Sequence, residues 1–236
     1  MGNSAKGRKV IHGILPAAGL ATRMRGLPKF LLPSSKEYES LLERHVRLMS
    51  EVCETIWIPT RPDLVPLINS LGLSTESVVI LPMATGSMTE TVIKTSAVSG
   101  SSRFLIVMPD TFFAGEQPYE FLSNCGGDMG LACWRIRPEQ AGKLGQIKVS
   151  KIPVGQVIEA KDKDPNCDFP HAWGAMSINR SVLTLAQNEM PHTGYLIPEL
   201  LEAGIPIGVR EMNGTYYDCG TPEEYIQMLR SEVSQS

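Results

Sequence analysis

A loop near the N-terminus combines small residues with basic ones. The small residues 17–19 (Ala-Ala-Gly) follow the apolar run 10–15, and Arg23 and Lys29 come shortly after them. Small residues let backbone N–H groups approach a ligand closely, and fixed cations neutralise the charge that spreads over phosphate oxygens during transfer. The loop therefore suits a phosphate ligand, although a tight strand exit with solvated cations would use the same residue types.

Two aspartates stand where a metal–phosphate site needs carboxylates. Asp110 follows the apolar run 104–108, and open α/β sheets bind ligands at the carboxyl ends of their strands. Asp218 precedes a helix start at which Thr221 and Glu224 already form a capping box, so the helix itself does not require it. Two such carboxylates can hold one Mg²⁺ between phosphates. Asp110 and Asp218 are therefore our predicted metal ligands.

The elements that position these residues alternate between strands and helices. Apolar runs predict buried strands at 10–15, 55–58, 78–81 and 104–108. Helical spacing predicts helices between them at 41–52, 63–71 and 86–98. After Asp110, Gly and Pro residues separate further strands, predicted at 131–136, 146–150, 156–160 and 172–178. Helices are predicted at 181–187, 195–203 and 222–230.

This alternation indicates an α/β fold with a Rossmann-like, doubly wound mixed sheet. With 236 residues, 42% of them hydrophobic, the chain can bury one sizeable core, and we expect a single domain over 1–236. Its nucleotide-binding half is expected at about 9–110 and its acceptor-binding half at about 111–236. The glycine patterns of dinucleotide-binding proteins and of P-loop ATPases are absent from the sequence, which argues against hydride transfer and ATP hydrolysis.

Charge and cysteine content restrict the partners of the protein. The formal net charge of −3 disfavours nucleic acid and anionic membrane surfaces as partners. The five cysteines include no Cys-x-x-Cys pair, and no apolar stretch approaches the roughly 18 residues that span a bilayer. We therefore expect a soluble, cytoplasmic protein, with homo-oligomerisation left open. Of the histidines, His12, His45 and His192 have the sequence surroundings of core or surface residues.

Three segments together resemble a known family. The run 17–24 followed by Leu27-Pro28-Lys29 is similar to the Gly-x-Gly-Thr-Arg…Pro-Lys signature of the sugar-1-phosphate nucleotidyltransferases, also called nucleotide-sugar pyrophosphorylases. The run 217–222 resembles their Tyr-Asp-x-Gly-Thr-Pro motif. In that family an aspartate after the fourth strand, here Asp110, and the aspartate of the second motif, here Asp218, bind the catalytic Mg²⁺. Ala18 and Ala21 replace two family glycines.

The resemblance assigns roles to residues of the first half. It implies that the catalytic residues are Arg23, Lys29 and Asp110. It also implies that the nucleotide is bound by Ala17, Ala18, Gly19, Thr22, Arg23, Met83 and Gly86. In the run 82–87 the family glycine is present as Gly86, but a Gln that thymidylyl- and uridylyltransferases commonly carry there is missing. The identity of the base therefore stays open.

The acceptor site is less well matched. The run 157–161 resembles a family segment whose Lys binds the acceptor phosphate, which implies Lys161, with Lys163 as a competing candidate. The family carries Glu directly before this Lys to contact sugar hydroxyls, whereas Ala160 stands here and Glu159 lies one place earlier. Two glycines complete the implied substrate-binding set as walls of the sugar pocket, namely Gly145 and Gly174.

The reaction implied is transfer of a nucleoside monophosphate from an NTP to a sugar-1-phosphate or a similar phosphorylated acceptor, with Mg²⁺ as cofactor and pyrophosphate as product. Because the acceptor phosphate is itself the nucleophile, no dedicated general base is required. Two alternatives remain: cytidylyl transfer to phosphocholine or a polyol phosphate, and a catalytically silent homologue that binds nucleotides in a regulatory role.

Overall fold

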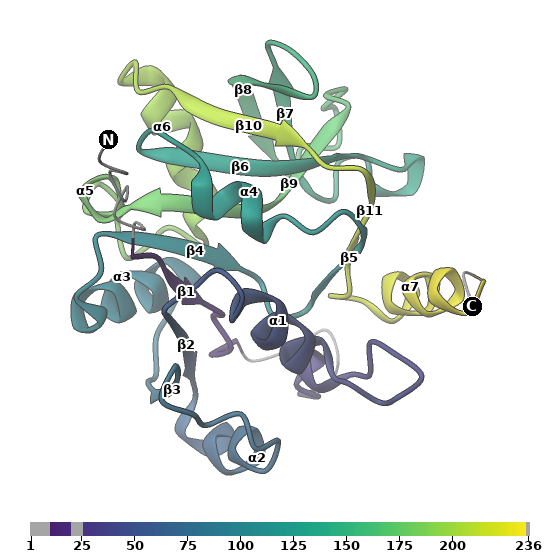
Figure 1. Ribbon diagram of the computed structural model, residues 1–236. Helices are drawn as coiled ribbons and strands as arrows, with labels where there is room; N and C mark the ends of the chain where they lie inside the picture. Colours follow the sequence, from purple (N-terminus) through teal and green to yellow (C-terminus); the bar gives the residue numbers. More distant parts are fainter. Residues whose placement is uncertain (1–9, 20–25, 235–236) are drawn as a thin grey trace, which may run out of the picture.

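The computed structural model describes residues 10–19 and 26–234 of the chain. Nine strands form one mixed sheet in the order β3-β2-β1-β4-β9-β6-β10-β8-β7 (Figure 1). Their bounds are β1 His12–Ile14, β2 Thr55–Thr60, β3 Val78–Pro82, β4 Arg103–Val107, β6 Met129–Arg135, β7 Gly145–Val149, β8 Val154–Asp162, β9 His171–Asn179 and β10 Ile207–Glu211. A separate two-stranded ribbon consists of β5 (Thr111–Gly115) and β11 (Gly214–Asp218).

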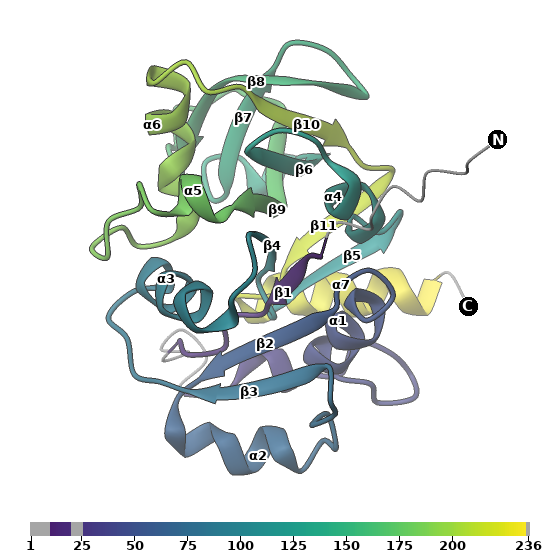
Figure 2. The same ribbon diagram turned by 60° about the vertical axis from the view of Figure 1, so that its left-hand side comes forward.

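The strands β3, β2, β1 and β4 are parallel and carry helices on both faces. Helices α1 (Leu41–Met49) and α2 (Val65–Asn69) contribute to one core, whereas α3 (Met88–Ser99) contributes to another on the opposite face. Figure 2 shows α1 and α3 on opposite sides of these strands. Burial on both faces explains why β4 reads as a continuous apolar run after Arg103 and is buried throughout.

Local sequence signals fix where the helices begin. Ser40 caps α1, its hydroxyl accepting from the Glu43 N–H while the Glu43 carboxylate accepts from the Ser40 N–H. Ser87 caps α3 by accepting from the Glu90 N–H, and Gly100 ends that helix with a left-handed φ of 72°. The apolar residues of α1 recur on one side, which is the buried side.

The remaining strands close into a ring. Strand β9 pairs with β6, β6 with β10, β10 with β8, β8 with β7, and β7 again with β9. These five strands therefore form a small closed barrel, which occupies the upper part of Figure 1 above the parallel strands. The sequence did not predict this closure, because the local patterns of β7 and β9 do not indicate that these two strands pair.

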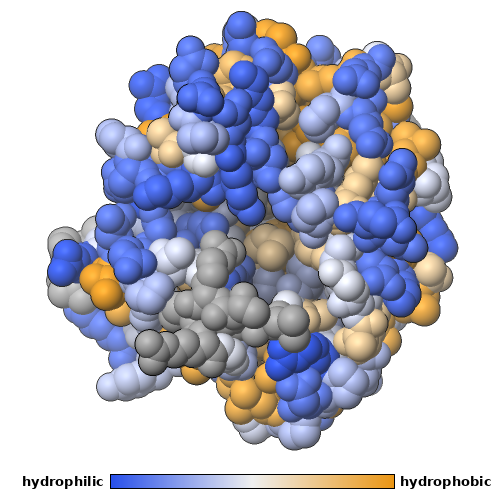
Figure 3. Space-filling model, turned by 180° about the vertical axis from the view of Figure 1, so that it is seen from behind, coloured by the Kyte–Doolittle hydropathy of each residue, from blue (hydrophilic) through white to orange (hydrophobic). Residues whose placement is uncertain are grey.

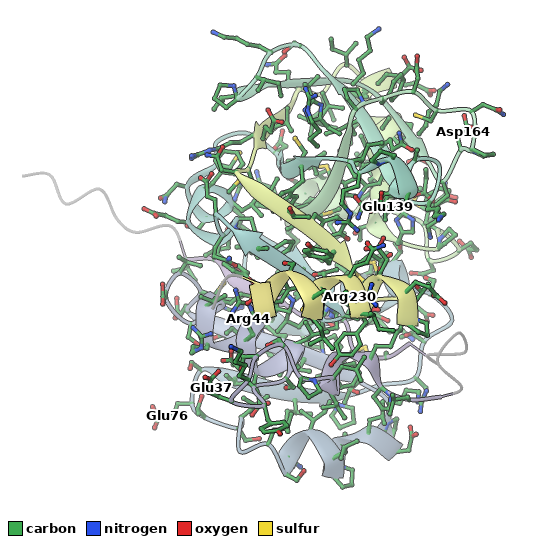
Figure 4. The ribbon with its side chains drawn as sticks, turned by 90° about the vertical axis from the view of Figure 1, so that its right-hand side faces the viewer. Glu37, Arg44, Glu76, Glu139, Asp164 and Arg230 are labelled. Carbon is green, nitrogen blue, oxygen red and sulfur yellow. The ribbon has the colours of Figure 1, made fainter. Side chains whose placement is uncertain are left out.

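The ribbon and the last helix connect the two parts of the molecule. Phe113 of β5 stacks on Trp134 of β6 at 4.8 Å between ring centroids, and Trp134 stacks on Tyr216 of β11 at 5.5 Å. Helix α7 (Pro222–Ser234) follows the ribbon and crosses beside it, with the labelled Glu139 on the barrel side of the helix (Figure 4). The ribbon is thus held by an aromatic stack that begins in the barrel.

The mixed α/β character predicted from the sequence is confirmed, and most predicted elements occur within a few residues of their expected bounds. Strands β5, β10 and β11 were not predicted. The helix expected at 181–187 is shorter, α5 (Arg180–Leu183), whereas α6 (Leu196–Glu202) and α7 match their expected positions. Helix α4 (Tyr119–Asn124) was also missed. Among the described residues, no helix has the length and apolarity that a bilayer crossing requires.

Candidate active site

The ribbon brings the two predicted metal ligands to the same place. Asp110 directly precedes β5, and Asp218 is the last residue of β11, opposite Thr111 in the antiparallel register. The Cys219 N–H donates to the backbone carbonyl of Asp110 at 3.0 Å. Both aspartates line one cavity of about 180 Å³. Residues more than a hundred positions apart in sequence are therefore neighbours, and the pairing of β5 with β11 is the cause.

Lys29 joins this pair of carboxylates. It begins the 3-10 helix η2 (Lys29–Leu31), and its Nζ lies 2.7 Å from Asp110 Oδ2, with the two side chains only 11% and 16% exposed. Gly220 leaves room for the Asp218 carboxylate beside the lysine, because a Cβ there would lie 2.7 Å from Asp218 Oδ1, with Lys29 Nζ at 3.4 Å. The Gly220 N–H donates to Asp218 Oδ1 at 3.0 Å. Lys29, Asp110 and Asp218 thus form one cluster, named here the carboxylate cluster.

The donor set of the carboxylate cluster fits Mg²⁺ better than a transition metal. No group of three or more His, Cys, Asp or Glu side chains within residues 10–19 and 26–234 is arranged to hold a metal ion by itself. Mg²⁺ is commonly bound by one or two carboxylates, with substrate phosphates and waters completing its octahedron. Asp110 and Asp218 offer that kind of partial oxygen shell.

Tyr216 and Cys219 lie beside the cluster and stay protonated. Burial raises the pKa of Tyr216 well above its ordinary value, and the nearby charges of Asp218 and Asp110 raise it further. Burial likewise raises the pKa of the Cys219 thiol, again with the two aspartates contributing. The phenol is therefore a neutral cavity wall, and the thiol is an unreactive core group.

Two predicted pocket glycines do line the cavity. A Cβ on Gly145 would lie 2.1 Å from the Trp173 ring, and a Cβ on Gly174 would lie 2.8 Å from the Tyr216 ring. Both positions therefore exclude a side chain, because aromatic rings of the cavity wall occupy the space.

Of the two candidate lysines, the structure places Lys163 at the cavity. Lys161 is instead 3.7 Å from Asp164 and lies 5.4 Å from the centroid of the Phe169 ring. Side chains alternate along β8, so Asp162 reaches the cavity while its neighbour Lys161 does not. Lys163 follows the strand with a φ of 50° and lines the cavity as well. Glu159, the other acceptor candidate, is exposed on β8 and is not among the described lining residues.

The nucleotide candidates lie at the carboxyl ends of the parallel strands. Ala17 forms a parallel bridge with Thr60, and the Met83 N–H donates to the Thr60 carbonyl at 2.8 Å, so these two candidates flank the end of β2. Ala18 and Gly19 continue from Ala17, whereas Thr22 and Arg23 lie outside the described residues. Gly86 precedes α3, and its N–H donates to the Glu90 carboxylate at 2.6 Å. These described candidates border the cavity edge of the sheet without lining the cavity itself.

Several cavity residues were not singled out from the sequence. They are Asp162, Trp173, His192 and Thr193. His192 was set aside as a core or surface residue, yet its ring lies in the cavity wall, with Nε2 3.1 Å from Asp162 Oδ2. A single His in a loop carries no periodic or motif signal, so only the folded chain reveals its partner. The surface seen in Figure 3 is hollowed between the two parts of the molecule.

Comparison with known proteins supports the same assignment at the level of fold. No protein-family model matches the chain, and neither does any curated protein sequence. Among solved structures, UDP-glucose pyrophosphorylase in complex with UDP-glucose matches 96% of this chain and 100% of its own, with a TM-score of 0.80 and 16% identity. UTP-bound UDP-glucose pyrophosphorylase from Acinetobacter baumannii matches 96% of this chain and 94% of its own, with a TM-score of 0.76 and 16% identity.

A third solved structure is a putative glucose-1-phosphate thymidylyltransferase from Bacillus anthracis. It matches 94% of this chain and 95% of its own, with a TM-score of 0.78 and 16% identity. These likenesses confirm, at the level of the fold, the resemblance inferred from the loop and the two aspartates. The chain has the fold of the sugar-1-phosphate nucleotidyltransferases.

Proposed function

We propose that the protein is a nucleotidyltransferase that moves a nucleoside monophosphate from an NTP to a sugar-1-phosphate or a similar phosphorylated acceptor and releases pyrophosphate. The observation that carries this proposal is the carboxylate cluster of Lys29, Asp110 and Asp218 at one end of a small cavity. It combines one cation with two carboxylates, as a transfer between phosphate groups requires. The similarity in fold to enzymes named for UDP-glucose and UTP supports it.

In this proposal the two halves of the chain have separate tasks. The parallel strands β3-β2-β1-β4, with helices on both faces, serve as the Rossmann-like, doubly wound unit that holds the NTP along residues 17–19 and Met83. The barrel supplies the acceptor cavity. Asp162 accepts hydrogen bonds from the non-phosphate part of the acceptor, and Lys163 faces its phosphate.

The chemistry is an in-line displacement. An oxygen of the acceptor phosphate attacks the α-phosphorus of the NTP, the bond between the α-phosphorus and the bridging oxygen breaks, and pyrophosphate carries away the electron pair. In this proposal Lys29, which lies beside Asp110, neutralises the negative charge that grows on the α-phosphate oxygens. Asp110 and Asp218 would hold Mg²⁺, which supplies Lewis-acid stabilisation of phosphate oxygens when bound.

One observation favours a second acceptor class. Trp173 and the Asp162 carboxylate line the cavity together, beside the apolar side chains of Met88 and Met176. An aromatic face with a nearby carboxylate binds quaternary ammonium groups by cation–π attraction and charge. Phosphocholine is therefore an acceptor to test beside the sugar phosphates.

The proposal is tested by pyrophosphate release over a matrix of substrates. Each of the four NTPs and dTTP is combined with glucose 1-phosphate, phosphocholine and glycerol 3-phosphate, with and without Mg²⁺. Release that requires one NTP, one acceptor and Mg²⁺ supports the proposal and identifies the substrates. If the protein binds an NTP but none of the substrate combinations releases pyrophosphate, the silent regulatory alternative is supported instead.

A further inference from the structure

His192 connects the cavity carboxylate to the loop beyond it. Its Nε2 lies 3.1 Å from Asp162 Oδ2, and its Nδ1 lies 3.2 Å from the backbone nitrogen of Gly194. The residue is the N-cap of the 3-10 helix η5 (Thr193–Tyr195). One imidazole therefore makes two directed contacts: one to Asp162 at the end of β8, and one to Gly194 in the 3-10 helix η5, which follows His192.

These contacts determine which nitrogen of the ring carries the proton. A backbone N–H can only donate, so the Gly194 N–H requires an unprotonated Nδ1. The neutral ring then carries its proton on Nε2 and donates it to the Asp162 carboxylate. In this tautomer the Nε2–H of His192 is an oriented hydrogen-bond donor to Asp162.

Asp162 is kept ionised by these neighbours although it is half-buried. Burial by itself raises its pKa, but the hydrogen bond from His192, the charge of Lys163 and the hydrogen bond from the Tyr195 hydroxyl hold the pKa below the ordinary value. A carboxylate has about four lone-pair positions, so two donors leave others free for a ligand. The carboxylate therefore presents only acceptor positions to the cavity, and a matching ligand brings an O–H or N–H donor.

His192 also packs beside Trp173, the aromatic wall of the cavity. A Cβ on Gly194 would lie 2.8 Å from both His192 Nδ1 and Trp173 Cζ2, so His192, Gly194 and Trp173 are packed without spare room. The Trp173 ring also packs against Gly145. A shift of the imidazole would therefore be transmitted to the indole face as well as to the carboxylate.

The loop that carries His192 has anchors of its own. The Met88 N–H donates to the Pro191 carbonyl at 3.2 Å, and the Ser87 hydroxyl donates to the Asn188 carbonyl at 2.6 Å. These bonds tie the loop to the start of α3 without the imidazole. Replacing the ring should therefore change the orientation of Asp162 while the loop stays in place.

We propose that His192 is a positioning residue for the acceptor: its Nε2–H orients the Asp162 carboxylate and thereby sets the affinity for an acceptor that carries a hydrogen-bond donor. This inference rests on the proposed function, because it names a determinant of specificity in the same cavity. It makes His192 a residue that acts through Asp162 and does not touch the reacting phosphorus.

Two substitutions of His192 distinguish its hydrogen bond to Asp162 from its capping of η5. In His192→Asn the amide oxygen replaces Nδ1 and keeps the cap on Gly194, but the donor to Asp162 is lost. In His192→Gln the amide nitrogen reaches the position of Nε2 and keeps that donor, but the cap is lost. His171→Gln is the matched control, because His171 pairs with Glu211 at 3.2 Å and is not among the described residues lining the cavity.

Kinetics are measured for glucose 1-phosphate and glycerol 3-phosphate, whose hydroxyl groups can donate to Asp162, using whichever gives turnover. The acceptor KM should rise at least about tenfold in His192→Ala and His192→Asn, since a hydrogen bond to a charged group is lost. In His192→Gln the acceptor KM should stay within about threefold of wild type. The kcat and the KM for the NTP should change little in all variants, including His171→Gln. ¹⁵N NMR of the wild-type ring should show the Nε2–H tautomer.

The outcomes that overturn the inference are distinct from failure of the proposed function. If His192→Asn behaves like wild type while His192→Gln behaves like His192→Ala, His192 only caps η5. An Nδ1–H tautomer in the neutral ring would also refute the positioning role. Turnover with phosphocholine alone, which has no O–H or N–H donor on its ammonium group, would overturn the inference and leave the proposed function standing. Absence of turnover by the wild-type protein with glucose 1-phosphate, glycerol 3-phosphate and phosphocholine would instead refute the proposed function, and the inference with it.

Discussion

The Nζ of Lys29 lies 2.7 Å from Asp110 Oδ2, and both Lys29 Nζ and Asp218 Oδ1 lie beside Gly220, 3.4 and 2.7 Å from the position of a Cβ there. Each of the three comes from a different part of the chain. Their convergence at one end of a cavity is the structural fact on which the proposed chemistry depends.

Replacing Lys29 by Met should abolish most of the activity while leaving the fold intact. The substitution removes the cation that neutralises charge in the transition state, and the loss of one such group lowers kcat by about 10²–10³-fold. Steady-state pyrophosphate release measures it, and circular dichroism checks the fold. Lys29→Arg, which keeps the charge, should retain more activity than Lys29→Met. Equal activity of Lys29→Met and wild type would remove Lys29 from the mechanism.

Adding a methyl group at either cavity glycine should impair acceptor binding. In Gly145→Ala and Gly174→Ala the new Cβ would lie 2.1 Å from Trp173 and 2.8 Å from Tyr216, so an aromatic wall must move. Overpacking of this kind costs about 1–3 kcal/mol, and we expect the acceptor KM to rise more than the NTP KM. Gly126→Ala is the control, since nothing lies within 4 Å of its added Cβ. The prediction fails if all three variants bind the acceptor equally well.

Arg137 should stabilise the ribbon that carries Asp218. Its guanidinium donates to the Tyr216 carbonyl at 3.1 Å and to Glu224 of α7 at 2.7 Å, and it lies 4.6 Å from the Tyr217 ring centroid. Arg137→Met should lower the free energy of unfolding by about 1–3 kcal/mol, as charged hydrogen bonds are lost. Urea unfolding measures the loss.

A surface ion pair provides the comparison for Arg137. The pair of Arg47 with Glu39 has the same 2.7 Å separation, but the Arg47 side chain is 54% exposed. Arg47→Met should therefore cost less than about 1 kcal/mol. A loss in Arg137→Met no larger than that in Arg47→Met would contradict the role assigned to Arg137.

Stability should depend on pH through His45. Burial lowers its pKa to about 4, although its Nε2–H donates to the Thr111 carbonyl at 2.9 Å. Because the folded-state pKa lies below the unfolded value of about 6.5, the stabilisation is fully present above pH 6.5 and is lost as the pH falls from 6.5 towards 4. By pH 5 this one group should lower the free energy of unfolding by about 2 kcal/mol.

Urea unfolding at pH 7.5 and pH 5 tests the role of His45. The difference in the free energy of unfolding between pH 7.5 and pH 5 should be about 2 kcal/mol smaller in His45→Gln than in the wild type, because Gln cannot be protonated. An unchanged difference would show that other groups cause the pH dependence.

The sequence predicted the residues of the carboxylate cluster, but it could not predict how they meet. Lys29, Asp110 and Asp218 each stand in a local pattern that can be recognised without the fold. Their proximity depends on the pairing of β5 with β11, which is a long-range contact that no local sequence pattern specifies. The barrel was missed for the same reason, since its closure depends on β7 reaching β9.

The acceptor residues were harder to predict because strand register decides them. A shift of one residue along β8 exchanges Asp162 for Lys161 at the cavity, and the sequence pattern of 157–163 does not fix that shift. No sequence pattern identifies His192, because the role of a single loop histidine depends on its contact with Asp162, which only the folded chain creates.

The most direct test of the proposed function is Mg²⁺-dependent pyrophosphate release by wild type, Asp110→Asn and Asp218→Asn. Asp128→Asn serves as a control, since Asp128 precedes β6 and accepts a hydrogen bond from Asn179 away from the cavity. We predict that wild type and Asp128→Asn release pyrophosphate, whereas each of the other two variants loses at least about 10²-fold in kcat. Undiminished release by Asp110→Asn or Asp218→Asn would contradict the proposed site.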